Sequence, residues 1–335
     1  MPNHQSVGKD VITSLAGRLI SCHADSHTER LLQAFHPSDE RSADLVQLKV
    51  DFTLNETSLI KALDASCVEF AHFLQGQEHV VRLRRNQEHA WISRHPRHAE
   101  NLLLSSQARA RVFVDHDSSH DASVMARPAV ESISAWATHN EVFPLHASAV
   151  SREDDGLLLV GEGGRGKTTT ALALAMCGWD LIADDRCFVN TQNEELFMHA
   201  LYRTSIVTSE VANRFPELLG EHFGITVEGK IATYLPKTIK FAQSSKIRGL
   251  VLLSQNHDEP YQMTRLTPRE ALTAWQQALM FADISRSPER SLFSLLTKAS
   301  RNVPAWRMNL GWDFQKLDKI LRRHMEKICT TLITK

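Results

Sequence analysis

The sequence is poor in the features that would place this chain outside a reducing cytosol. Its five cysteines are scattered along 335 residues and include no C-x-x-C pair, so we expect neither a disulfide framework nor a zinc site. No apolar run approaches the length of a membrane span, and the N-terminus lacks the basic and apolar regions of a signal peptide. These absences predict a cytoplasmic protein with free thiols.

The chain also has almost no net charge. Its 38 Lys and Arg residues balance 39 Asp and Glu residues, which gives a formal net charge of −1. Nothing in this total indicates a nucleic acid or an anionic membrane surface as a partner. A hydrophobic content of 42% and a length of 335 residues are typical of a soluble globular protein with two domains.

Alternating and turn-bounded patterns in the first third of the chain predict strands. Residues 46–52 alternate apolar and polar side chains, residues 79–84 and 88–93 form a candidate hairpin, and residues 109–114 form another strand. Residues 11–20 have the pattern of an amphipathic helix. We therefore expect a small α+β N-terminal domain over residues 1–125, followed by a second domain over residues 126–335.

Two polar groups in the N-terminal part have both a functional and an ordinary explanation. The first is a set of metal-ligand types that a solvated loop explains equally well: Asp115, His116, Asp117, His120 and Asp121. The second is a basic strip that would face an acidic substrate but is more often the wet side of a hairpin: Arg82, Arg84, Arg85, Arg94 and Arg97.

The most informative stretch matches the phosphate-binding loop G-x-x-x-x-G-K-[ST] in full. It consists of Gly161, Glu162, Gly163, Gly164, Arg165, Gly166, Lys167 and Thr168, with Thr169 opening the run that follows. The apolar run 157–160 reads as a buried strand, and residues 169–177 are rich in helix-forming Ala and Leu. Strand, loop and helix together would direct backbone N–H groups and a helix dipole at an anion.

Further polar residues are expected close to this loop. Residues 179–183 predict a strand that ends in Asp184 and Asp185, and only 16 residues separate Thr168 from Asp185. A single helix fills that gap, so the acidic pair should lie beside the loop, where it could hold Mg²⁺ or take a proton from a hydroxyl. A hairpin of residues 143–150 and 157–160 around a polar turn would bring His146 near the phosphates.

The C-terminal part continues the α/β pattern. Residues 248–253 and 303–310 predict strands, and Thr267, Pro268 and Glu270 open a helix with a capping box. Further helices are expected over 288–300 and from 314 onward. Several cations in this half could neutralise phosphoryl charge, namely Arg203, Lys230, Lys237, Arg248 and Arg286.

The runs LHASAV, GLLLVGEGGRGKTTTALALAMCGW and LIADD resemble the HPr serine kinase/phosphorylase family. They are closer still to HPr-kinase-related proteins that include kinases of lasso-peptide precursors, and the wider superfamily contains the PEP carboxykinases. The strong match covers about residues 145–185, and IRGLVLL, LTPREAL and VPAWRMNL extend it more weakly. The resemblance implies an α/β fold with an HPr-kinase/PEP-carboxykinase-like core around a mixed sheet.

The resemblance also implies roles for individual residues. The loop from Gly161 to Thr168 would cradle the phosphates of ATP, with Thr168 on Mg²⁺. Asp185 would help to bind the metal, Asp184 would act as a base toward the acceptor hydroxyl, and His146 would assist in handling charge or a proton. The two aspartates could exchange these roles.

The leading hypothesis is an ATP- and Mg²⁺-dependent kinase that phosphorylates a hydroxyl, with a serine of a protein or peptide as the leading acceptor. The same machinery would serve a small-molecule acceptor, such as a sugar or hydroxy acid. A third hypothesis is a nucleotide-binding regulator or assembly protein, which Glu162 in the loop would allow and which intact Lys167, Thr168 and the paired aspartates argue against. A homo-oligomer is possible under each hypothesis.

Overall fold

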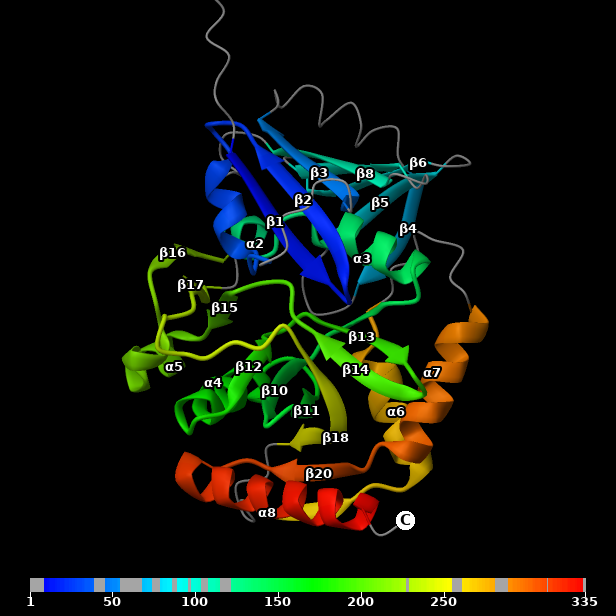
Figure 1. Ribbon diagram of the computed structural model, residues 1–335. Coiled ribbons are helices and arrows are strands. Elements are labelled where there is room, and N and C mark those ends of the chain that lie inside the picture. The colour runs from blue at the N-terminus through cyan, green and yellow to red at the C-terminus, as the bar shows by residue number, and fades with distance from the viewer. Residues whose placement is uncertain are drawn as a thin grey trace, which may run out of the picture.

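The structure of the chain is a computed structural model. It describes residues 9–38, 46–54, 68–73, 79–85, 89–95, 98–103, 108–114, 122–226, 229–254, 261–280, 289–311 and 313–333. Two large sheets and a small one form the frame, with helices between and around them (Figure 1). None of the helices within these ranges is long and apolar enough to cross a membrane.

The N-terminal part is an eight-stranded sheet in the order β1-β2-β3-β8-β7-β6-β5-β4. The strands β2, β3 and β8 run parallel to one another, and the other pairs are antiparallel. The predicted hairpin is confirmed as β5 and β6. The strands are β1 (Lys9–Leu15), β2 (Arg18–Ala24), β3 (Val46–Leu54), β4 (Val68–Phe73), β5 (His79–Arg85), β6 (His89–His95), β7 (His98–Leu103) and β8 (Ala108–Val114).

The amphipathic helix predicted for residues 11–20 is wrong. These residues belong to β1 and β2, which pair antiparallel with Leu15 opposite Arg18. The two residues between them, Ala16 and Gly17, both have positive φ values, 52° and 75°. Two left-handed residues in succession form the tight turn whose twist suits a hairpin, and they end any helix.

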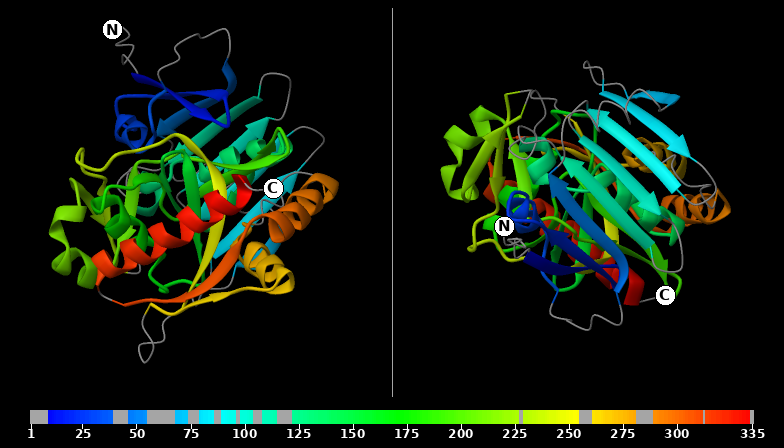
Figure 2. Two further views of the ribbon diagram at one scale, coloured as in Figure 1. Left: turned by 60° about the horizontal axis from the view of Figure 1, so that its bottom comes forward. Right: turned by 90° about the horizontal axis from the view of Figure 1, so that it is seen from above.

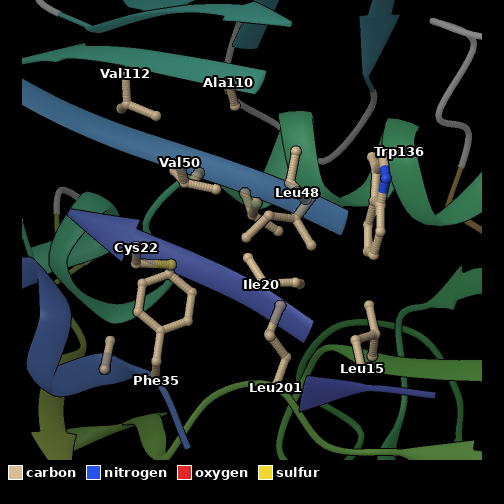
Figure 3. Packing of buried hydrophobic residues seen from close by; sticks show 14 of the residues in the cluster. Leu15, Ile20, Cys22, Phe35, Leu48, Val50, Ala110, Val112, Trp136 and Leu201 are labelled. Carbon is tan, nitrogen blue, oxygen red and sulfur yellow. The ribbon is translucent and has the colours of Figure 1, made fainter. Parts of the chain in front are cut away.

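One face of this sheet is covered by helices. The 3-10 helix η1 (Glu29–Ala34) and the helices α2 (Ala122–Ala126) and α3 (Val130–His139) pack against it. Figure 3 shows Leu48, Val50 and Ile20 of the sheet near Trp136 of α3 and Leu201 of the second half. Because α2 and α3 follow residue 121 yet pack on the first sheet, one core joins both halves, and the division at residue 125 stays a prediction.

The second large sheet has nine strands and mixed pairing, so the predicted α/β class is confirmed. Its main order is β12-β10-β11-β18-β14-β13-β9, with β20 beside β18 and β19 beside β20. The trio β11, β18 and β20 is parallel, and the other pairs are antiparallel. The strands are β9 (Phe143–Leu145), β10 (Ser148–Arg152), β11 (Asp155–Val160), β12 (Asp180–Ala183), β13 (Cys187–Gln192), β14 (Glu195–His199), β18 (Ser244–Ser254), β19 (Met263–Arg265) and β20 (Ala305–Asn309).

Side chains on the buried central strand β11 alternate between two cores. Leu157 and Leu159 pack with α4 (Lys167–Met176) and α8 (Phe314–Ile333). Leu158 and Val160 pack with α6 (Pro268–Ala278) and α7 (Glu289–Asn302). The sheet is therefore covered on both faces, which is typical of strands that are apolar along their whole length (Figure 2).

A small three-stranded sheet adjoins α2. It contains β15 (Thr204–Val207), β17 (Ile231–Tyr234) and β16 (His222–Ile225), and the helices α5 (Ser209–Arg214) and η4 (Pro216–Leu218) follow β15. Figure 1 shows this sheet beside α2 and above α4. Its first strand reaches the candidate site described next.

Candidate functional site

The glycine-rich loop joins the end of β11 to the start of α4. Gly161 has a φ of 146° and Gly166 a φ of 86°, both in the left-handed half of backbone space that favours glycine. A Cβ atom on Gly161 would lie 3.0 Å from the Leu253 carbonyl, and one on Gly166 would lie 2.7 Å from Leu310. Helix α4 begins directly at Lys167, so its free N–H groups open onto the loop.

Lys167 is buried across the loop that precedes it. Its ammonium donates hydrogen bonds to the carbonyls of Gly161 at 2.8 Å and Glu162 at 3.1 Å. Burial lowers the pKa of Lys167, and the charges of Asp185 and Asp184 oppose that shift. The exposed Glu162 side chain pairs with Arg165 at 2.8 Å, so its charge turns away from the loop interior.

The rest of the site lies where two short irregular segments face each other, one between β9 and β10 and the other between β12 and β13. Leu145 of β9 is paired with Cys187 of β13, and Ala149 of β10 is paired with Ala183 of β12. Between these pairs the chain leaves the regular ladder at residues 146–147 and 184–186. His146 and the acidic pair therefore lie opposite each other.

A tight turn separates the two carboxylates. Asp185 has a φ of 65°, and the Arg186 N–H donates to the carbonyl of Asp184 at 2.8 Å. This three-residue γ-turn with positive φ is rare and strained, and such strain concentrates at functional sites. As a result, consecutive aspartates have different surroundings.

Asp184 lies among hydroxyl groups. Its two carboxylate oxygens accept hydrogen bonds from Ser148 at 2.8 Å and Ser205 at 2.6 Å, and the Thr168 side chain also contacts it. Burial, together with the charge of Asp185, raises the pKa of Asp184, and the hydroxyl donors oppose this. Asp184 thus takes up a proton more readily than an ordinary aspartate.

Asp185 lies among cations. Arg127 and Arg186 both contact its Oδ2, at 2.9 Å and 2.7 Å, and His146 Nδ1 is 3.2 Å from its Oδ1. Burial alone would raise the pKa of Asp185, but the Arg127 and Arg186 guanidinium groups hold it well below its usual range. Asp185 therefore stays ionised and supplies a fixed negative charge.

His146 is neutral at physiological pH. Burial lowers its pKa to about 4, with Asp185 opposing the shift and Lys167, Arg186 and Arg127 adding to it. His146 Nδ1 lies 3.0 Å from Arg186 Nη1 and 3.2 Å from Asp185 Oδ1, so this one nitrogen faces both a guanidinium donor and a carboxylate acceptor.

The structure brings Lys167, Thr168, His146 and the two aspartates close together, and it adds residues that the sequence did not indicate. Ser148, Arg186, Arg127 and Ser205 are the additions. Arg186 directly follows the acidic pair, so its position was a usable signal. Arg127 and Ser205 come from α2–α3 and β15, and no local pattern marks them.

Two of the other candidate cations have partners away from the acidic pair, whereas Lys230 lies within electrostatic reach of Lys167. Arg248 pairs with Asp155 at 2.5 Å, and Arg203 stacks on the Phe241 ring. Arg286 and the polar set from Asp115 to Asp121 lie outside the described residues, as do the side chains of the basic strip. Among the described residues, no group of three or more His, Cys, Asp or Glu side chains is arranged to hold a metal ion.

Fold and site together define a mixed α/β protein with a phosphate-loop sequence and an adjoining acidic pair. Neither a protein-family model nor a curated protein matches the chain. Among solved structures, it is similar to the Hpr(Ser) kinase/phosphatase from Coxiella burnetii, with a TM-score of 0.33 and 16% identity. That similarity covers 55% of this chain and 97% of the other.

Proposed function

We propose that the protein is an ATP- and Mg²⁺-dependent kinase that transfers the γ-phosphate to a hydroxyl, with a serine of a protein or peptide as the leading acceptor. One observation carries this proposal. Lys167 and Thr168 of a complete phosphate-loop sequence open helix α4, the Thr168 side chain contacts Asp184, and the charges of Asp184 and Asp185 act on Lys167. Phosphoryl transfer needs this combination of an anion cradle, a cation and carboxylates, because catalysis is mainly positioning and charge stabilisation.

The donor atoms in the cluster suit magnesium. Mg²⁺ prefers oxygen ligands such as carboxylates and hydroxyls, which Thr168, Asp184 and Asp185 supply. When bound, the ion would neutralise charge on the phosphate oxygens. Thr168 and Asp185 are the proposed ligands, because Asp185 stays ionised.

Asp184 is the proposed proton acceptor for the attacking hydroxyl. A base works best when its pKa is raised toward the operating pH, and burial raises the pKa of Asp184. A second assignment exchanges the two roles, with Asp184 on the metal and Asp185 as the base, and the contact of Asp184 with Thr168 supports it. The variants Asp184→Asn and Asp185→Asn separate the two assignments, because loss of the base leaves metal binding intact.

The cations around Asp185 are proposed to stabilise the transferring group together with Lys167. Arg186 is mostly buried and bonded to both Asp185 and His146, so its charge is held at the site. His146, whose pKa burial lowers to about 4, is proposed to act as a neutral group beside these cations.

The test is transfer of labelled γ-phosphate from ATP into fractions of the native host's lysate. Lys167→Ala and Asp184→Asn are the inactivating variants. Arg152→Ala is the matched control, because Arg152 pairs with the exposed Glu153 at the far end of β10. Label in one protein or peptide that both inactivating variants lose supports the proposal, and label only among small molecules would change the acceptor class. Tight ATP binding without any transfer would contradict the kinase and support a regulator.

A further inference from the structure

The short segment between α2 and α3 is held firmly on both sides of Arg127. The Thr204 hydroxyl donates to the Ala126 carbonyl at 2.6 Å, and the Tyr202 hydroxyl donates to the Pro128 carbonyl at 2.8 Å. Both donors are buried. Ala129 then turns the chain into α3 with a φ of 57°. The backbone that carries Arg127 is therefore fixed before any ligand arrives.

The same segment is attached to the N-terminal sheet. Glu100 on β7 is only 1% exposed, and its carboxylate accepts a hydrogen bond from the Ser132 N–H at 2.7 Å. Ser132 is in the first turn of α3, where a negative side chain satisfies a free N–H and complements the helix dipole. Trp136 of α3 is buried in the core of that sheet (Figure 3).

At its other end, the segment reaches the site through the Arg127 side chain. Arg127 and Arg186 both contact Oδ2 of Asp185. Oδ1 lies 3.2 Å from His146 Nδ1, which in turn lies 3.0 Å from Arg186 Nη1. Two guanidinium groups on Oδ2 and the His146 ring beside Oδ1 fix the orientation of the Asp185 carboxylate.

We propose that Arg127 is a positioning residue through which the eight-stranded sheet sets the orientation of Asp185. This inference rests on the proposed function, and it makes the N-terminal sheet a structural part of the active site. Removing a residue that orients a metal-binding side chain typically costs about 10- to 100-fold in metal affinity or in activity.

The test compares Arg127→Ala, Arg127→Lys and the control Arg152→Ala in the full-length protein. We expect Arg127→Ala to lower kcat by about 10- to 100-fold with little change in the KM for ATP. Arg127→Lys, or guanidinium ion added to Arg127→Ala, should restore part of the loss. Mn²⁺ binding to the nucleotide-free protein, followed by electron paramagnetic resonance, should be no weaker in Arg127→Ala, because a positive charge beside Asp185 has been removed.

These readouts separate positioning from a merely structural role. A merely structural residue would lower kcat, ATP affinity and Mn²⁺ affinity together, and that pattern would overturn the inference. Wild-type kcat in Arg127→Ala would overturn it as well. A wild-type protein that transfers no phosphate removes the proposed function and this inference with it, whereas an active wild type with an unchanged Arg127→Ala removes this inference alone.

The link to the sheet has its own variant. Glu100→Gln keeps an acceptor for the Ser132 N–H but removes the charge, so we expect a smaller loss of kcat in the same direction at temperatures where the variant is folded. A lower melting temperature with unchanged kcat would overturn the role of the sheet.

Discussion

Removing the Asp318 carboxylate should weaken the attachment of the C-terminal helix to the segment just after the helix that starts at the phosphate loop. Asp318 on α8 accepts a hydrogen bond from the Trp179 indole N–H at 2.7 Å and from Arg322 Nε at 2.6 Å. Arg322 also donates to the Cys177 carbonyl, just past the end of α4, at 2.7 Å. Trp179 is fully buried and Asp318 is 6% exposed, so water cannot replace the lost acceptor.

The size of the effect follows from these contacts. A hydrogen bond to a charged group contributes about 1.5–3 kcal/mol, and the partly exposed pair with Arg322 adds about 1 kcal/mol or less. Asp318→Ala should therefore lower the free energy of unfolding by about 2–4 kcal/mol. Asp318→Asn, which keeps an acceptor for Trp179, should cost about half as much.

Equilibrium urea unfolding followed by circular dichroism measures these differences. Glu153→Ala is the control, because Glu153 forms an exposed ion pair with Arg152 and should change stability by about 0.5 kcal/mol or less. A loss in Asp318→Ala as small as that of the control would refute the reasoning that the Trp179 N–H depends on this carboxylate.

Two further predictions concern the phosphate loop and a buried histidine. Gly166→Ala should destabilise the nucleotide-free protein more than Gly164→Ala, since both have positive φ but only Gly166 would bring a Cβ against Leu310; equal melting temperatures would show that Leu310 gives way freely. His199 bonds Asn190 at 2.9 Å, and burial lowers its pKa to about 4. The unfolded chain with a histidine pKa of about 6.5 then binds the proton first, so this residue's stabilisation is complete above about pH 6.5 and is lost as the pH falls toward 4. The loss is about 2 kcal/mol at pH 5. His199→Gln should flatten the fall in unfolding free energy between pH 7 and 5, and an unchanged slope would contradict a buried neutral ring.

Local spacing was enough to predict the centre of the site. The strand, loop and helix around Lys167 are consecutive in sequence, and the acidic strand β12 follows after one helix. The hairpin of β10 and β11 brings His146 back by a short turn. Each of these steps depends on neighbours along the chain, so periodicity and turn residues carry the necessary information.

Other parts of the structure depend on contacts between distant segments. Ser205 reaches Asp184 from a strand 21 residues further on, and Arg127 reaches Asp185 from a turn that has no motif of its own. The β1–β2 hairpin was mistaken for a helix because its apolar residues also fit a helical period, and only the two left-handed residues at Ala16 and Gly17 distinguish the two structures.

The candidate site forms only when two pairs of strands have the correct register, because it lies between β9 and β10 on one side and between β12 and β13 on the other. His146 meets the acidic pair only if Leu145 stands opposite Cys187 and Ala149 opposite Ala183. A slip of two residues along either strand would keep the side chains on their proper faces and could leave a compact molecule. It would still separate His146 from Asp185 and Ser148 from Asp184. A chain trapped in the wrong register would therefore be compact but would lack the assembled site.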